Sequence, residues 1–155
     1  MDWVVQPIML KMLLKTFKFD IMKTYMEKEK VKQMQPLVLA MIGDSVQTLF
    51  VREHIAKTFG FKVNKMNKMV SSVVSAGSQF LTFKKIEEEL SEDEADIARR
   101  ARNTHIHTKA KNFSFNEYIH ATALEALLGY LHLTRQTERL NYFLEKSLEE
   151  LKTDV

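Results

Sequence analysis

Two acidic side chains interrupt stretches of the sequence that are otherwise apolar. Asp44 lies within residues 36–50, and Glu125 lies within residues 121–133. Both stretches have the composition of a buried helix. A carboxylate is rarely buried in a protein unless it is paired or binds a metal. We therefore expect the two helices to face each other and to hold a divalent cation between Asp44 and Glu125.

A cation held by two carboxylates predicts hydrolysis without a covalent intermediate. Such an ion lowers the pKa of a bound water and stabilises charge on a phosphoryl oxygen. The chain has no cysteine and no Gly-x-Ser-x-Gly, Walker or Gly-x-Gly-x-x-Gly motif, so thiolate, serine-elbow and glycine-loop chemistries find little support. Ser45 is expected in the middle of a helix, which makes it a poor nucleophile. The alternative for each acid alone is a salt-bridged or N–H-bonded helix carboxylate.

A basic segment precedes the stretch that carries Glu125. Residues 87–96 contain seven acids and no base, whereas residues 97–116 contain five Lys or Arg and no acid. Lysine and arginine neutralise phosphates whatever the base sequence. We expect the basic segment to contact a phosphate backbone; the alternative is a solvated linker that balances the acidic block. His105 and His107 lack the spacing of a helical metal-binding pair and are expected to be polar loop residues.

The composition favours a single all-α domain. The chain has 155 residues, of which 45% are hydrophobic and 28% charged, with only four Gly and two Pro. No segment alternates as a strand should, and no apolar run approaches the roughly 20 residues of a membrane span. We expect a cytoplasmic protein, in line with the absence of cysteine. Residues 1–33 are expected to form an N-terminal extension with a frayed or accessory amphipathic helix, and residues 34–152 the main domain.

Local signals divide the main domain into about five helices. Pro36 fits a first helical position, and Gly60 supplies a stop. Asn64 opens a long segment whose helical spacing of apolar residues continues to Leu81.

Two capping boxes and an apolar stripe mark the later helices. Ser91–Glu94 predicts a short helix over residues 95–101, and Ser114–Glu117 opens the helix that carries Glu125. Thr134 ends that helix or caps the next one. The last helix has an apolar stripe, which comprises Leu140, Phe143, Leu144, Ser147, Leu148 and Leu151.

Four separated motifs resemble the ribonuclease III family, and the closer match is to its Mini-ribonuclease III form, which has the nuclease domain alone. They lie at residues 36–46, 74–79, 99–103 and 121–133, in the order and at the spacing of that family. The resemblance covers roughly residues 35–150. It implies the helical bundle of a ribonuclease III endonuclease domain over residues 34–152.

This resemblance implies a homodimeric endonuclease that cuts double-stranded RNA with Mg²⁺ and matures the ends of large-subunit (23S) ribosomal RNA. A ribosomal protein or a pre-ribosome is a further partner to consider. Asp44 and Glu125 would then be the catalytic, metal-binding acids. The RNA-contacting residues would be Arg99, Arg100, Arg102, Asn103, Lys109, Lys111, Lys65 and Lys68.

The site departs from the wider ribonuclease III pattern. That pattern has further acids where this chain has Leu37, Ala40 and Thr122, so weaker metal binding is expected. The alternative function is a non-catalytic RNA-binding or ribosome-associated protein on the same fold. The presence of both Asp44 and Glu125 favours the enzyme.

The first long helix is also the expected dimer interface. Apolar residues are spread around most of its circumference, as in a helix that is buried on more than one side. They are Leu37, Val38, Leu39, Met41, Ile42, Val46, Leu49 and Phe50.

Overall fold

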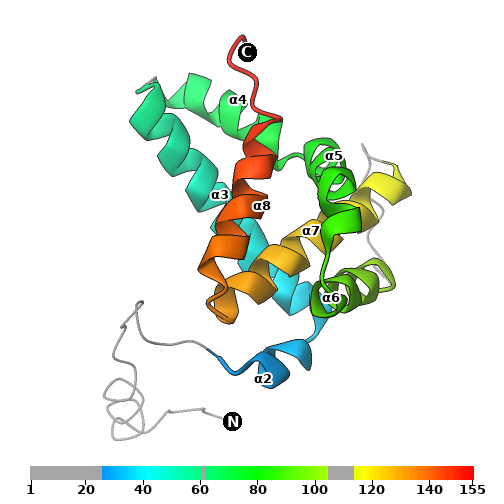
Figure 1. Cartoon of the computed structure of the whole chain (residues 1–155). Coiled ribbons are helices and arrows are strands. Elements are labelled where there is room, and N and C mark those ends of the chain that lie inside the picture. Colours follow the sequence, from blue (N-terminus) through cyan, green and yellow to red (C-terminus); the bar gives the residue numbers. More distant parts are fainter. Residues whose placement is uncertain (1–25, 61, 105–113) are drawn as a thin grey trace, which may run out of the picture.

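The structure is a computed structural model that describes residues 26–60, 62–104 and 114–155. In these ranges the chain forms helices joined by short connections, with no strand, which confirms the all-α prediction (Figure 1). The elements are α2 Lys28–Lys32, α3 Pro36–Thr58, α4 Val63–Val74, α5 Ala76–Ile86, the 3₁₀ turn η1 Glu87–Glu89, α6 Glu92–Arg102, α7 Phe115–Leu133 and α8 Thr137–Leu148.

Helix α7 runs through the centre of the fold. It packs against α3, α5, α6 and α8, which surround it in Figure 1. A helix that is apolar on all sides must lie in a core, and α7 buries every residue from Ala121 to Leu131 except Glu125, which is only partly exposed. The central helix therefore holds one acid within an apolar surface.

The predicted helix starts are confirmed where a capping residue marks them. Pro36 occupies the start of α3. The Ser91 hydroxyl accepts a hydrogen bond from the Glu94 backbone N–H at 3.3 Å, and the Glu94 carboxylate accepts one from the Ser91 N–H at 2.9 Å. Ser114 and Glu117 repeat this exchange at the start of α7. Each box satisfies donors that the first helical turn leaves free.

The single long helix expected from Asn64 to Leu81 is wrong. The structure ends α4 at Val74 and begins α5 at Ala76, because Ser75 adopts an extended conformation with φ −66° and ψ 151°. The Ser75 hydroxyl accepts a hydrogen bond from the Ser78 N–H at 3.4 Å, as an N-cap does. The apolar spacing continues through this break, so periodicity alone does not reveal it.

The end of the expected N-terminal extension packs against the domain. Val31 of α2 is fully buried in the main core, and the Met26 backbone N–H donates to the Leu133 carbonyl at 3.0 Å. The remainder of the extension, residues 1–25, lies outside the described residues.

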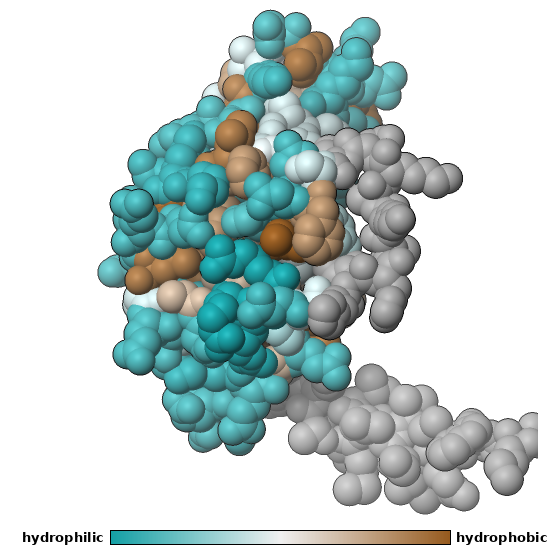
Figure 2. All heavy atoms as spheres, turned by 90° about the vertical axis from the view of Figure 1, so that its right-hand side faces the viewer, coloured by the Kyte–Doolittle hydropathy of each residue, from teal (hydrophilic) through white to brown (hydrophobic). Residues whose placement is uncertain are grey.

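The face formed by α5, α6 and the start of α7 is mostly hydrophilic, with separate hydrophobic patches (Figure 2). Three large apolar side chains on α3 are also exposed, namely Leu37, Met41 and Leu49. Among the helices described, none has both the length and the apolar character that a membrane crossing requires.

Candidate functional site

Helices α3 and α7 cross with their backbones in direct contact, and two glycines allow it. A Cβ atom on Gly43 would lie 1.7 Å from the Glu125 carbonyl oxygen, and one on Gly129 would lie 2.0 Å from the Leu39 carbonyl oxygen. Any side chain at either position would therefore collide with main chain. Because Gly43 precedes Asp44 and touches the Glu125 backbone, this crossing brings the two acid-bearing segments together.

A cleft of about 440 Å³ opens at this crossing. Asp44 of α3, Glu125 of α7 and Gln79 of α5 supply its polar groups, together with Thr122 and Tyr118. The remaining lining is apolar and comprises Leu37, Ala40, Met41, Val74, Ala76 and Ala121. Asp44 and Glu125 thus line one cleft, which is the arrangement that a shared cation requires.

The two acids differ in burial. Glu125 is mostly buried, as the sequence indicates, whereas the expectation of a buried Asp44 is wrong, because this side chain is exposed. None of the helices that the structure describes covers the outward face of α3 at this level, and Met41, one turn earlier, is also exposed. Asp44 therefore offers a hydrated carboxylate, and Glu125 a largely desolvated one.

Burial raises the pKa of Glu125 to about 7. The hydrogen bond from Gln79 opposes this shift, and the negative charge of Asp44 adds to it. Desolvation disfavours the charged form of a carboxyl, and a neighbouring carboxylate does the same. Near neutral pH, Glu125 is therefore poised between its protonated and ionised forms, and a bound cation would favour the ionised one.

Gln79 is a site residue that the sequence analysis missed. Its Nε2 donates to Glu125 Oε1 at 3.0 Å and to Gln47 Oε1 at 2.9 Å. Both glutamines are buried. The sequence feature that could have indicated Gln79 is an amide side chain at a core-facing position of α5, with a second one on α3. Buried polar side chains are normally hydrogen-bonded, so each such amide needs a partner.

The donor set fits a hard divalent cation. Mg²⁺ prefers oxygen ligands and usually keeps several waters, so two carboxylates on an open cleft suit it. Within the part of the chain that the structure describes, no cluster of three or more His, Cys, Asp or Glu offers a more complete metal site. Asp44 and Glu125 are thus the side chains that would hold the ion.

The arginines expected to contact RNA differ in their surroundings. The Arg100 guanidinium donates to the backbone carbonyls of Lys32 and Met34, with the second contact at 2.9 Å. Arg102 donates to Glu87 at 2.9 Å, and its guanidinium lies 5.7 Å from the centre of the Phe83 ring. Both side chains bind α6 to its neighbours.

The other candidate RNA contacts are at or near the surface or lie outside the described residues. Arg99 is exposed and pairs with Asp96 on its own helix, and Asn103 ends α6. Lys65 and Lys68 lie on α4, which the fold separates from α6 (Figure 1). The outlying residues are Lys109, Lys111, His105 and His107, which fall in the range 105–113.

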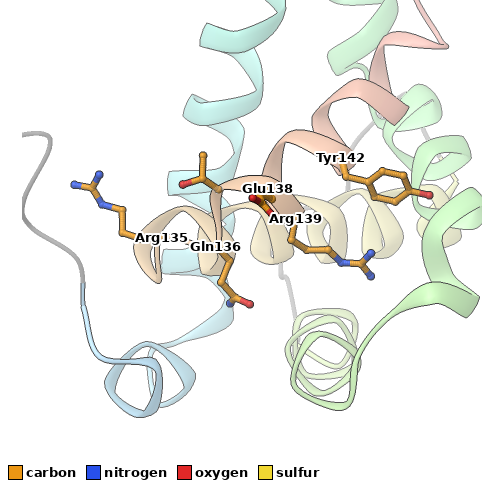
Figure 3. Close-up of a pocket in the computed structure, with 6 residues that line it drawn as sticks. Arg135, Gln136, Glu138, Arg139 and Tyr142 are labelled. Atoms are coloured by element: carbon orange, nitrogen blue, oxygen red, sulfur yellow. The ribbon is translucent and has the colours of Figure 1, made fainter.

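A second, larger cleft of about 690 Å³ lies at the turn between α7 and α8. Figure 3 shows its labelled side chains spread along the turn, with Arg135 directed away from Arg139 and Tyr142. The Arg139 guanidinium donates to the buried Glu94 carboxylate at 2.9 Å, and the Tyr142 hydroxyl donates to Glu89 at 2.7 Å. Arg139 and Tyr142 thus bind the protein, and Arg135 points away from them, so the cleft at Asp44 and Glu125 is the candidate site.

The chain is similar to proteins of known family over most of its length. A model of the ribonuclease III domain matches residues 37–136. The Mini-ribonuclease 3 of Clostridium tetani is 42% identical over 73% of this chain and 76% of its own length, and that of a Thermoanaerobacter species is 42% identical over 81% and 88%.

A solved structure agrees with these sequence relatives. The crystal structure of a Fusobacterium nucleatum protein superposes with a TM-score of 0.68 at 31% identity, and the match covers 76% of this chain and 93% of that one. The chain therefore belongs to the ribonuclease III family, among the Mini-ribonuclease 3 proteins, and is an endoribonuclease.

Proposed function

We propose that this endoribonuclease cleaves double-stranded RNA with Mg²⁺ held by Asp44 and Glu125. The observation that carries the proposal is the convergence of these two carboxylates, from two crossing helices, on one open cleft. The sequence relatives support ribonuclease activity, and the oxygen donors suit the cation.

The two acids would contribute to the reaction in different ways. When bound, Mg²⁺ would activate a water for in-line attack on the phosphodiester and stabilise charge on the phosphoryl oxygens. In the proposed reaction the bond from phosphorus to the 3′ oxygen breaks and this oxygen leaves as a hydroxyl, so that the products carry a 5′-phosphate and a 3′-hydroxyl. Asp44 is hydrated and accepts a hydrogen bond from the Thr48 hydroxyl at 3.5 Å. Glu125 is held by Gln79 and must release its proton before it can bind the cation. The more buried acid therefore sets the pH at which the site becomes active.

The proposed enzyme is a homodimer. Cutting both strands of a duplex requires a second site, and a two-fold pair of chains supplies it. Leu37, Met41 and Leu49 lie along α3 with exposures of 41%, 65% and 59%, which is unusual for large apolar side chains of one helix in a single chain. Other apolar residues of the expected interface, such as Leu39, belong to the core instead. The exposed three form the surface that a second copy would cover.

The proposed substrate is the duplex stem at the ends of a large-subunit ribosomal RNA precursor, in the cytoplasm, with a ribosomal protein or a pre-ribosome as a further partner. Duplex RNA presents mainly phosphates and 2′-hydroxyls to a protein. Arg99, Lys68 and the segment that contains Lys109 and Lys111 would contact these groups. Arg100 and Arg102 would mainly hold α6 in place, given their internal partners.

A cleavage assay tests the proposed reaction. The purified protein is incubated with a long RNA duplex, with single-stranded RNA of the same sequence and with a 23S precursor stem, each with Mg²⁺ and with EDTA. We expect cutting of the two duplex substrates with Mg²⁺, and no cutting with EDTA or of the single strand. Equal cleavage in EDTA would contradict the metal mechanism, and preference for the single strand would contradict the substrate.

A further inference from the structure

We infer that Gln79 is a positioning residue of the nuclease site, and that Gln47 aligns it. The inference rests on the proposed metal-binding role of Glu125. Gln79 donates a hydrogen bond to Oε1 of that carboxylate and thereby orients the Glu125 side chain to bind the cation through its other oxygen. Neither glutamine would contact the RNA phosphate that is cut.

Three helices contribute to this hydrogen-bonded chain. Gln47 comes from α3, Gln79 from α5 and Glu125 from α7, and the two bonds measure 2.9 Å and 3.0 Å. Gln47 has no exposed surface and Gln79 is 2% exposed. Water therefore competes little for these bonds, and a buried, fully packed amide holds its partner in one orientation.

The chemistry of the groups fixes the direction of the chain. Glu125 must be ionised to bind a cation, and an ionised carboxylate only accepts hydrogen bonds, so in that state Gln79 must turn its Nε2 toward Glu125. The same NH₂ group has a second proton, which it donates to Gln47 Oε1. Gln47 is thereby required to present its oxygen, and its own Nε2 is buried without a partner.

An unpartnered buried amide destabilises the fold. Apolar side chains at Gln47 and Gln79 would fill the same space without that cost, so packing does not explain the pair. The arrangement of the two amides is explained if both of them orient the Glu125 carboxylate. Groups behind a metal ligand commonly orient it in this way, and their loss lowers metal affinity or activity by 10- to 100-fold.

The matched variants are Gln79→Met, which keeps the length of the side chain and removes the donor, and Thr82→Val on the same helix. Thr82 is also fully buried, and its hydroxyl donates to the Ser78 carbonyl at 3.0 Å, away from Glu125. The second variant controls for the general effect of removing a buried hydrogen bond from α5.

The primary measurement is Mn²⁺ binding without RNA, followed by electron paramagnetic resonance, with Asp44→Asn to identify the site. We expect Gln79→Met to weaken Mn²⁺ binding by roughly 10- to 100-fold and to lower kcat with little change in the KM for duplex RNA. Thr82→Val should bind Mn²⁺ as the wild type does. Gln47→Met keeps the hydrogen bond from Gln79 to Glu125 but removes the group that aligns Gln79, so its effect on Mn²⁺ binding should be smaller. If Gln79→Met does not fold, Gln47→Met tests the positioning role.

The possible results separate the two levels of the proposal. Wild-type affinity and kcat in folded Gln79→Met, or in Gln47→Met if only that variant folds, would overturn the positioning role and leave the proposed reaction intact. A wild-type protein that cuts RNA but shows no Mn²⁺ binding sensitive to Asp44→Asn would overturn the metal assignment and this inference with it. An equal loss of binding in Thr82→Val would reduce Gln79 to a structural residue.

Discussion

At the crossing of α3 and α7 the charged side chains face a cleft, whereas on α6 most of the charged side chains bind the protein itself. Asp44 and Glu125 share their cleft with apolar groups, one amide and two hydroxyls, and no basic side chain of the described residues lines it. Arg100 and Arg102, by contrast, donate to backbone carbonyls and to Glu87. Both regions stand out in the sequence by their charged residues. The acids at the crossing remain open to a ligand, whereas of the three arginines of α6 only Arg99 is exposed.

The difference has a physical cause. Helix α7 is buried on almost every side, and at Gly43 and Gly129 its backbone lies directly against that of α3. The described residues that surround Glu125 in the cleft are uncharged apart from Asp44. Helix α6 lies at the edge of the fold beside free carbonyls and the acids of η1, which are good partners for guanidinium groups. A charge in the sequence becomes a binding surface only where the fold does not neutralise it.

The largest effect is expected from Asp44→Asn, which removes one of the two proposed metal ligands and leaves the fold intact, because the side chain is exposed. Metal stabilisation of a phosphoryl transfer amounts to several kcal/mol, so duplex cleavage should fall by about 10³-fold. Single-turnover cleavage measures the loss, and circular dichroism checks the fold. Wild-type turnover in this variant would show that Asp44 has no role in cleavage, and the contrast with the internally paired Arg100 would then fail.

Gly129→Ala tests the contact that brings the acids together. The new Cβ would meet the Leu39 carbonyl oxygen at 2.0 Å, and neither backbone can yield easily. We expect a loss of about 3 kcal/mol in the free energy of unfolding, which corresponds to a Tm lower by roughly 10 °C.

Gly77→Ala is the matched control for this variant. A Cβ on Gly77 of α5 would meet only the Glu117 carboxylate, at 4.0 Å. Alanine favours a helix over glycine by up to about 1 kcal/mol, so this variant should be as stable as the wild type or more so. Thermal unfolding that ranks the two variants the other way would contradict the close-contact explanation.

The features set by neighbouring residues could be predicted from the sequence. The starts of α6 and α7 depend on Ser91 and Ser114, each with a glutamate three residues later. The pairing of Asp44 with Glu125 followed from one acid in each of two apolar helices. The break at Ser75 was missed because a local hydrogen bond overrides an apolar pattern that continues through it.

Features that join distant parts of the chain could not be predicted in this way. Gln79 meets Glu125 across 46 positions, and Arg100 meets the carbonyl of Met34 across 66. The residue type gives a side chain's hydrogen-bonding capacity but not its partner. Arg100 and Arg102 are therefore predicted from the sequence to contact RNA, whereas in the fold they bind the Lys32 and Met34 carbonyls and the Glu87 carboxylate.

The raised pKa of Glu125 predicts an opposite pH dependence for activity and stability. At low Mg²⁺, kcat/KM should rise about tenfold per pH unit up to about pH 7 and then level off, because only the ionised form binds the cation. Higher Mg²⁺ should move this midpoint to lower pH. The folded state holds a proton that the unfolded state releases, so stability should fall as pH rises from the ordinary value of 4.5 to about 7.

The pH profiles of Glu125→Gln separate this group from the others. The variant has no ionisable group at this position, so its free energy of unfolding should lose the decline between pH 4.5 and 7. Urea unfolding at a series of pH values measures it. A decline equal to that of the wild type would place the responsible group elsewhere.

Leu49→Lys tests whether the open face of α3 is covered by a second chain. Leu49 is 59% exposed and does not line the candidate cleft at Asp44 and Glu125. A charge in an apolar interface loses its hydration, so we expect the dimer dissociation constant to rise by at least about tenfold, the equivalent of 1.4 kcal/mol. Analytical ultracentrifugation measures it, with Val63→Lys on α4 as control, because Val63 is also apolar and exposed. A wild-type monomer at micromolar concentration would contradict the dimer itself.

The smallest effects are expected where single phosphates are contacted, and they sharpen the contrast between α6 and the crossing. Simultaneous substitution of Arg99, Lys109 and Lys111 by glutamine should weaken the binding of all RNA duplexes alike. Each lost phosphate contact should flatten the slope of log affinity against log salt by about 0.9 or less.

Arg100→Gln should leave that slope unchanged and lower stability instead, because it breaks the bonds to the Lys32 and Met34 carbonyls. Filter binding at several salt concentrations, with thermal unfolding of the same proteins, distinguishes the two roles. An altered salt slope in Arg100→Gln with unchanged stability would mean that α6, like the crossing, keeps its charge for the ligand.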